Sequence, residues 1–309
     1  MKTNAPRLLV LTFLFGLGAL FAHSAIAQRV KAFQTFPAGN SPDDLAFDGA
    51  NIWVANGGDN TVTKLRARDG TSQGTFPTGS LPAGIVFDGE NIWVANANDN
   101  ALSKLRASDG TLLGTFPVGH YPEGMAFDGA NVWVVNNEGN SVSKVRASDG
   151  VLLGTFPVGR SPNHVLFDGQ SIWVSNSTSF TVTKLRASDG SLEGTVSVGK
   201  GPNGMAFDGS KIWVAIGGGD RMAVLQASNG DIIGSVDVGH LPVGVTFDGA
   251  NIWVTDVGSN DVIGIRAQTG IPKVVIQSGN SPVAVLFDGT SIWVANIDSD
   301  TVSKISRNP

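Results

Sequence analysis

The sequence predicts an all-β protein: a seven-bladed β-propeller with four antiparallel strands per blade. Tryptophan recurs every 40 residues, seven times, from Trp53 to Trp293. Short apolar runs within each 40-residue unit are separated by Asp-Gly pairs, which are typical of tight turns. The last unit ends one strand short, and a strand-like segment of matching sequence stands near the N-terminus. Together these features predict a closed ring of repeated sheets.

Composition narrows the class of protein. The 309 residues include 40 Gly, 14 Pro and no Cys, and 41% are hydrophobic. That apolar content is typical of a folded chain, and the glycine content disfavours a helical bundle. The absence of Cys excludes disulfides, thiolate metal ligands and cysteine nucleophiles. A net charge of −5 gives no electrostatic basis for nucleic-acid binding, so we expect no nucleic-acid partner.

Residues 1–27 have the features of a signal peptide. Lys2 and Arg7 precede an apolar stretch at 8–22, and Ala25-Ile26-Ala27 fits a cleavage site. This stretch of about 15 residues is short for a membrane span, although an N-terminal anchor helix is the alternative. We expect residues 28–309 to form a single domain, secreted or periplasmic, monomeric and without a membrane span after cleavage. Loss of Lys2 and Arg7 leaves 19 basic and 26 acidic residues, a formal charge of −7.

Each 40-residue unit is expected to supply four short strands. In one unit they lie at 83–87, 91–96, 101–107 and 112–119. Asp88-Gly89 and Asp109-Gly110 mark two of the turns, because glycine accepts a positive φ without a Cβ clash. The strands are apolar runs rather than strict alternations, which indicates sheets covered on both faces. Sheets stacked radially around an axis satisfy this requirement.

The two ends of the chain favour a ring over an open solenoid. The seventh unit stops after its third strand, and residues 33–39 match the fourth strand of the other units. An open solenoid gains no stability from this displacement of one strand to the N-terminus, and it needs polar terminal repeats. In a ring, the N-terminal strand completes the last blade and removes both free sheet edges.

The repeat resembles a known family. Trp53-Val54-Ala55-Asn56, with runs such as DGTLLGTFPVG at 109–119, is similar to the YVTN β-propeller repeat, and the similarity covers residues 30–309. This resemblance implies an exported or surface propeller used for binding or as a structural module. Residues 242–256 also resemble the streptogramin (virginiamycin B) lyases, seven-bladed propellers related in shape to lactonases. Those lyases use His and acidic residues with Mg²⁺ at the central mouth. No segment matches their catalytic runs, so no catalytic residue is carried over. The chain does not resemble quinoprotein or WD40 propellers.

Residues that recur in every unit are expected to be structural. The tryptophans are predicted to pack between blades, with a carbohydrate-binding aromatic platform as the alternative. Lys64, Arg66 and their counterparts are interpreted as solvated side chains whose stems lie over apolar neighbours. The repeated Asp-Gly pairs are predicted turns rather than catalytic carboxylates.

Residues that break the repeat are the candidates for function. They concentrate where one unit connects to the next, and these connections also hold the three histidines and the only tyrosine that follow residue 27. The connections lead into the innermost strands, so their side chains should surround the central mouth. A solvated rim whose sequence drifts freely is the alternative. The candidate ligand-binding residues are Asp43, Asp44, His120, Tyr121, Glu123, Arg160, Asn163, His164, Lys200, Asn203 and His240.

The chemistry of this set leaves three functions open. The first, which we favour, is an exported module that binds a small molecule, glycan or protein through its polar mouth. The second is a metal-assisted lyase or lactonase. Its base or metal ligand would come from the candidates His120, His164, His240, Glu123 and Tyr121. The third is a structural propeller without a dedicated site. No Ser-His-Asp order and no HExxH motif favours an enzyme.

Metal binding has weak support in the sequence. The resemblance to the lyases suggests Mg²⁺, and loops rich in Asp and Asn could supply oxygen ligands to Ca²⁺. Their spacing fits no known calcium loop, and tight turns need the same residues, so no metal ligand is assigned. In the fifth unit Gly217-Gly218-Gly219 predicts flexible or closely approached backbone, with a phosphate cradle as the weaker alternative.

Overall fold

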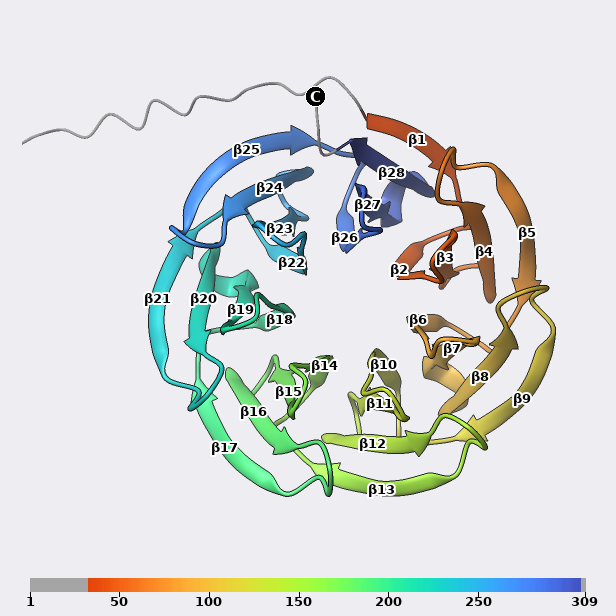
Figure 1. Cartoon of the computed structure of the whole chain (residues 1–309), viewed down its shortest axis with the longest axis horizontal. Helices are drawn as coiled ribbons and strands as arrows, with labels where there is room; N and C mark the ends of the chain where they lie inside the picture. The colour runs from red at the N-terminus through yellow and green to blue at the C-terminus, as the bar shows by residue number, and fades with distance from the viewer. Residues whose placement is uncertain (1–32, 307–309) are drawn as a thin grey trace, which may run out of the picture.

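The structure, a computed structural model, describes residues 33–306 and confirms the predicted fold. Its 28 strands form seven four-stranded antiparallel sheets, arranged as blades around a central axis (Figure 1). We number the blades from β2: blade 1 is β2–β5, blade 6 is β22–β25, and blade 7 is β26–β28 with β1. The expected signal peptide at 1–27 lies outside the described residues.

Within each blade the strands follow one another outward from the axis (Figure 1). The innermost are β2 (Pro42–Phe47), β6 (Pro82–Phe87), β10 (Pro122–Phe127), β14 (Pro162–Phe167), β18 (Pro202–Phe207), β22 (Pro242–Phe247) and β26 (Pro282–Phe287). The second are β3 (Asn51–Asn56), β7 (Asn91–Asn96), β11 (Asn131–Asn136), β15 (Ser171–Asn176), β19 (Lys211–Ile216), β23 (Asn251–Asp256) and β27 (Ser291–Asn296). The third are β4 (Thr61–Arg66), β8 (Ala101–Arg106), β12 (Ser141–Arg146), β16 (Thr181–Arg186), β20 (Arg221–Gln226), β24 (Asp261–Arg266) and β28 (Thr301–Ser306). The outermost are β1 (Phe33–Pro37), β5 (Ser72–Pro77), β9 (Leu112–Pro117), β13 (Leu152–Pro157), β17 (Leu192–Ser197), β21 (Ile232–Asp237) and β25 (Ile271–Gln277).

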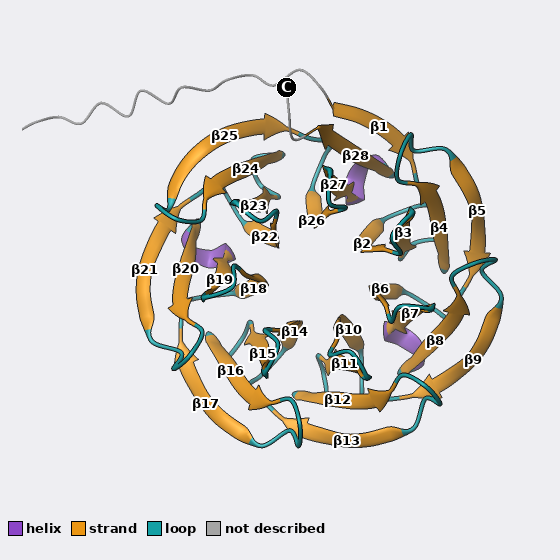
Figure 2. Ribbon diagram, in the orientation of Figure 1, coloured by secondary structure: helices purple, strands orange, loops and turns teal. Residues whose placement is uncertain are grey.

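Within residues 33–306, helical structure is confined to short 3₁₀ turns between second and third strands (Figure 2). They are η1 (Ala97–Asp99), η2 (Gly217–Gly219) and η3 (Ile297–Ser299). In the described part of the chain, no helix has the length and apolar character needed to cross a membrane.

The N-terminal strand closes the ring, as the sequence predicts. β1 pairs antiparallel with β28, from Phe33 opposite Ile305 to Pro37 opposite Thr301. Blade 7 therefore has four strands like the others. The pairing covers the edge of β28, which would otherwise expose unpaired backbone groups.

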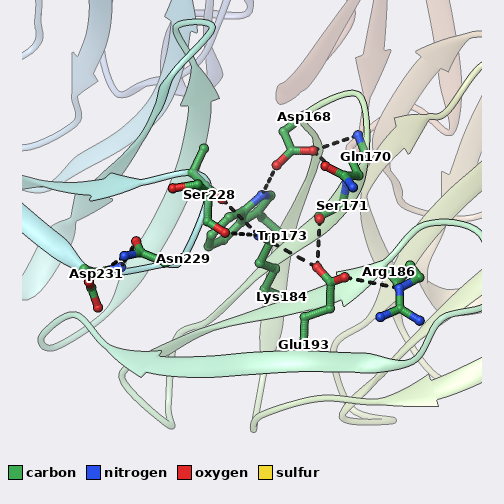
Figure 3. Close-up of polar contacts among 11 residues, drawn as sticks. Asp168, Gln170, Ser171, Trp173, Lys184, Arg186, Glu193, Ser228, Asn229 and Asp231 are labelled. Atoms are coloured by element: carbon green, nitrogen blue, oxygen red, sulfur yellow. Dashed lines mark hydrogen bonds and ion pairs between the residues drawn. The ribbon is translucent and has the colours of Figure 1, made fainter.

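Each tryptophan packs between its own blade and the next, which confirms the structural interpretation. Trp93 is fully buried and packs with Met125, Val132 and Val134 of blade 3. Its indole Nε1 donates a hydrogen bond to Oδ2 of Asp88 at 2.7 Å. The same contact recurs in every blade, as between Trp173 and Asp168 in Figure 3. The aspartate of each Phe-Asp-Gly turn thus also fixes a core indole.

Lys64, Lys104 and Lys144 are buried and Lys184 and Lys304 are partly buried, so the prediction of solvated side chains was wrong for the third-strand lysines. The Nζ of Lys104 lies 5.0 Å from the centre of the Trp93 ring and donates to the carbonyl of Ala147 in the next blade at 2.7 Å. Blade 4 repeats this contact, with Lys184 reaching Ser228 of blade 5 (Figure 3). A buried ammonium needs such partners. The repetition of a lysine in the sequence does not reveal them. The paired arginines, such as Arg106, are exposed as expected.

Candidate ligand site in the central channel

The innermost strands surround a polar cavity of about 270 Å³ at the end of the channel where the inter-blade connections enter. Each of these strands begins with a buried proline, which fixes φ at the entry to the strand. The residue after that proline lines the cavity in every blade. These seven residues are Asp43, Ala83, Glu123, Asn163, Asn203, Val243 and Val283. Blades 1, 3, 4 and 5 therefore supply polar side chains, whereas blades 2, 6 and 7 supply apolar ones.

The next position is glycine in most blades, because neighbouring inner strands approach each other closely there. A Cβ on Gly124 would lie 2.7 Å from the carbonyl oxygen of Asn163 in blade 4. Asp44 and His164 occupy this position in blades 1 and 4, and both side chains line the cavity. Asp44 uses its carboxylate to accept the backbone N–H of Ile85 in blade 2 at 3.0 Å.

Three carboxyl groups with raised pKa values line this cavity. Burial raises the pKa of Asp43 to about 6. Burial also raises the pKa of Asp44 to about 7, against the opposing effect of hydrogen bonds from the N–H groups of Ile85 and Leu45. The pKa of Glu123 rises to about 7, again chiefly through burial, although Asn137 donates to it at 3.1 Å. Near neutral pH these groups therefore exchange protons readily.

An ordered amide chain lies beside the carboxyl groups. Asn163 Nδ2 donates to Oδ1 of Asn203 at 2.6 Å, and Asn203 Nδ2 in turn donates to the carbonyl of Pro242 at 3.3 Å. Oδ1 of Asn163 accepts the hydroxyl of Ser175 at 2.7 Å. These bonds fix the orientation of both amides. The amide donors and acceptors that are still free therefore point in fixed directions.

His164 adds a neutral imidazole. Its Nδ1 is buried without a hydrogen-bond partner, and burial lowers its pKa to about 4. His164 and Asp44 line both the polar cavity and a second cavity of about 560 Å³, which continues the channel. The second cavity is mainly apolar, with Phe47, Phe87 and Phe127 among its walls. The two cavities meet at residues that include Asp44 and His164, with the carboxyl groups of Asp43 and Glu123 on one side and the phenylalanine side chains on the other.

The other predicted site residues lie at the rim rather than in the cavity. His120, Arg160, Lys200 and His240 are exposed. His240 Nδ1 lies 3.1 Å from both carboxylate oxygens of Asp220, a neighbour on its own face. Tyr121 is half-buried with φ of 54°, and burial together with the Glu123, Glu138 and Asp43 charges raises its pKa.

The structure thus divides the predicted set in two. It brings together Asp43, Asp44, Glu123, Asn163, His164 and Asn203. These six belong to the innermost strands rather than to the connections, which corrects the sequence placement of His164 in particular. The apolar wall and the partners Asn137 and Ser175 were missed. Both partners depart from the repeat, since Gly57 and Ala55 stand at the equivalent positions of blade 1, so departure from the repeat is the signal that could have found them.

The Asp- and Asn-rich loops are held by backbone hydrogen bonds. Asp59 accepts the N–H of Asn40 at 2.6 Å, and Asp99 accepts that of Ser80 at 2.7 Å. In blade 5 the N–H groups of Gly217 and Gly218 donate to the carbonyls of Gly201 and Lys200. These contacts account for the closely approached backbone expected there, and they engage amides that a phosphate cradle would require.

No set of metal ligands supports the Mg²⁺ or Ca²⁺ expectation. Between residues 33 and 306, no three His, Cys, Asp or Glu side chains gather in a way that could hold a metal ion.

Comparisons with known proteins extend the fold assignment. No family model matches the chain, and no curated protein sequence matches it. Among solved structures, a streptogramin B lyase is similar with a TM-score of 0.77 and 18% identity, over 89% of this chain and 97% of the lyase. Kuenenia stuttgartiensis hydrazine synthase is similar with a TM-score of 0.78 and 16% identity, over 87% of this chain and 96% of that chain. At these identities the likeness shows a shared propeller fold. One of these structures is a lyase of the kind that the sequence resembles.

Proposed function

We propose that this propeller binds a small, positively charged molecule, such as an organic amine, in the polar end of its central channel. One observation carries the proposal: Asp43, Asp44 and Glu123 line one cavity, and no lysine or arginine is among its lining residues. A volume of about 270 Å³ suits a small molecule better than a protein segment or a long glycan.

The carboxyl groups provide the attraction for such a ligand. Their raised pKa values, about 6 to 7, leave them partly protonated near neutral pH. A cation beside them favours the ionised forms, so binding releases protons and strengthens as pH rises from about 5 to 8. The fixed amides of Asn163 and Asn203 and the unpartnered Nδ1 of His164 orient the ligand's polar groups. The apolar interior accepts its hydrocarbon part.

Calorimetry tests this proposal with a panel of putrescine, agmatine and choline, and with butane-1,4-diol as the uncharged counterpart of putrescine. At least one cation should bind saturably at pH 8, at least tenfold more weakly at pH 5, and the diol should not bind. Glu123→Gln should weaken binding at least tenfold. Glu138→Gln, which removes an exposed carboxylate near the rim, is the matched control. Absence of binding by the whole panel, or equal binding by the Glu123 variant, would contradict the proposal.

A lyase or lactonase acting in the same channel is a second candidate. The fold similarity to a streptogramin B lyase favours it, as does the presence of Glu123 and His164 in one cavity. A neutral imidazole and a carboxyl with a pKa near 7 are suited to proton transfer. Mass spectrometry of a streptogramin B and of simple lactones after incubation would detect ring opening. Activity that survives both His164→Ala and Glu123→Gln would exclude this site.

We also propose that the protein is exported, since residues 1–27 have the charge, apolar stretch and cleavage site of a signal peptide. N-terminal sequencing of the protein from a bacterial periplasm or culture medium should begin at Gln28. An intact Met1 in those fractions would contradict this cleavage.

A further inference from the structure

A third cavity, of about 820 Å³, lies in blade 6 away from the channel entrance. Its walls come from the turn after β22, the turn after β24, and the turn between β18 and β19 of blade 5. These turns stand at the opposite end of the blades from the inter-blade connections, so this cavity is separate from the candidate site described above. Its lining includes Trp253.

The cavity lies where blade 6 lacks the third-strand lysine that covers the tryptophan in blades 1 to 4 and 7. Blade 5 has Val224 at that position, and Lys211 lies over Trp213 instead. In blades 1 to 4, that lysine pairs across the sheet with a glycine of the outer strand, as Lys184 does with Gly194. Blade 6 reverses the pair, with Gly264 in the third strand opposite Val274. No ammonium therefore covers the Trp253 ring from this strand. Trp253 is 6% exposed, whereas the other six tryptophans are at most 2% exposed.

The outer strand of blade 6 changes the same surface. Ile276 stands where Phe76, Phe116 and Phe156 pack against the tryptophans of blades 1 to 3. The cavity is therefore lined by Trp253 together with Val274 and Ile276. Such a lining favours a flat apolar group.

The charges at the cavity edge are positive. Arg106, Arg146 and Arg186 each form an ion pair with the aspartate three residues later. Thr269 stands at that place in blade 6, and within residues 33–306 no ion pair is found for Arg266. Lys273 replaces the residue equivalent to Glu193, which in blade 4 pairs with Arg186 (Figure 3). Both cations line the cavity and are exposed.

The acidic side chain in the lining is already engaged. Asp208 accepts the indole N–H of Trp213 at 2.9 Å and the backbone N–H groups of Ser210 and Lys211. Lys211, a third cation in the lining, donates to the carbonyl of Ala267 at 3.2 Å. Arg266 and Lys273 are consequently available to an anion, and a guanidinium holds a carboxylate through two parallel hydrogen bonds.

We propose that this blade-6 cavity binds a small aromatic carboxylate, with its ring against Trp253 and Val274 and its carboxylate on Arg266 and Lys273. The volume of about 820 Å³ lies in the range of small-molecule sites. This ligand is an anion, whereas the ligand proposed for the channel is a cation. Anionic and cationic probes therefore distinguish the two sites.

Nuclear magnetic resonance of the indole N–H groups tests the proposal, because the protein contains only seven tryptophans. Trp253→Phe assigns the Trp253 signal. Titration with 2-naphthoate should shift this signal saturably, with a dissociation constant of about 1 mM or tighter for a ligand of this size. The uncharged 2-naphthamide should bind at least tenfold more weakly. The double variant R266Q/K273Q should weaken 2-naphthoate binding at least tenfold, and Arg186→Gln in blade 4 should not change it.

A second variant fills the cavity with the residues of the other blades. Gly264→Lys alone would bring a Cβ within 2.9 Å of Val274, so the pair G264K/V274G is used to restore the arrangement of blade 4. It should fold and should lose the Trp253 shift. No shift with 2-naphthoate, equal binding of the amide, or unchanged binding in R266Q/K273Q would each overturn the proposal.

Discussion

The carboxyl of Asp256, at the end of β23, lies directly across the strand pair from Asp261, at the start of β24. Asp256 is fully buried, and its carboxyl faces the backbone N–H of Gly239 and the carboxyl of Asp261. In five other blades asparagine occupies this position, and its amide donates to serine or threonine hydroxyls, as Asn136 does to Ser141 and Ser143. Blade 6 thus places two acids where the repeat places an amide and hydroxyls.

This pair predicts a stability that falls as pH rises. Burial and the Asp261 charge raise the pKa of Asp256 from 3.8 to about 8. The folded protein therefore favours protonated Asp256, and this contribution to stability is complete below pH 4 and lost as pH rises toward 8. Asp256→Asn should raise the free energy of unfolding by about 1–3 kcal/mol at pH 8, and much less at pH 4. Urea denaturation at both pH values measures this, and an equal effect at both would contradict it.

The lysines between blades should matter more than exposed lysines. Lys104→Met keeps the stem but removes the ammonium that the buried Ala147 carbonyl and the Trp93 ring contact. A buried carbonyl left without a donor costs about 1–3 kcal/mol. The midpoint of urea unfolding should fall accordingly. Lys200→Met, at an exposed lysine, should leave it nearly unchanged, and similar effects of the two substitutions would refute the role of the contact.

Asp128, one of the aspartates that hold the tryptophans, should contribute to the acid sensitivity of the fold. Burial raises the pKa of Asp128, but hydrogen bonds from Trp133, Asn131 and backbone N–H groups outweigh burial, so the net pKa lies below 3.8. The ionised form therefore stabilises the fold above pH 4, and this stabilisation is lost as pH falls further. Asp128→Asn should cost about 1–2 kcal/mol at pH 7 and less at pH 3. Denaturation curves that show the same loss at pH 3 would disprove the linkage.

The close approach of inner strands should make one glycine much less replaceable than another. In Gly124→Ala the new methyl group would meet the backbone of Asn163 and His164 at 2.7 and 2.9 Å. Backbone cannot move aside as a side chain can, so we expect a loss of about 1–3 kcal/mol. Gly194→Ala, where a Cβ meets nothing within 4 Å, is the control. Thermal unfolding compares the two, and equal melting temperatures would show that the strands have room to separate.

The fold could be predicted in detail because its determinants are local and repeated. The 40-residue period, the Asp-Gly turns and the offset of residues 33–39 specify strand number and closure without knowledge of any long-range contact. The burial of Lys64 and Lys104 could not be predicted in this way. Their partners are backbone carbonyls of the next blade. Every residue has a backbone carbonyl, so the sequence does not identify these partners.

The candidate site was only partly accessible from sequence. Departure from the repeat selected Asp43, Glu123 and Asn163, which line the channel, but it equally selected His120 and Arg160, which the structure leaves exposed. The two rim residues stand two positions before the proline that begins the inner strand, whereas the three cavity residues stand one position after it, and this difference decides between rim and cavity. The blade-6 cavity was missed although Gly264 departs from the repeated lysine, because the lysine was interpreted as solvated and its loss therefore did not predict an uncovered tryptophan.

Because β1 closes the ring, its pairing with β28 can form only after almost the whole propeller has been synthesised. β1 is made near the beginning of the chain, whereas its partner β28 ends at Ser306. The first strand must remain unpaired while six complete blades follow it, because its partner does not yet exist. Contacts of such wide sequence separation form slowly, and an unpaired strand edge invites association with other chains. A chain that stops before β28 therefore leaves two open edges, so truncation near the C-terminus should cause aggregation rather than yield a smaller stable ring.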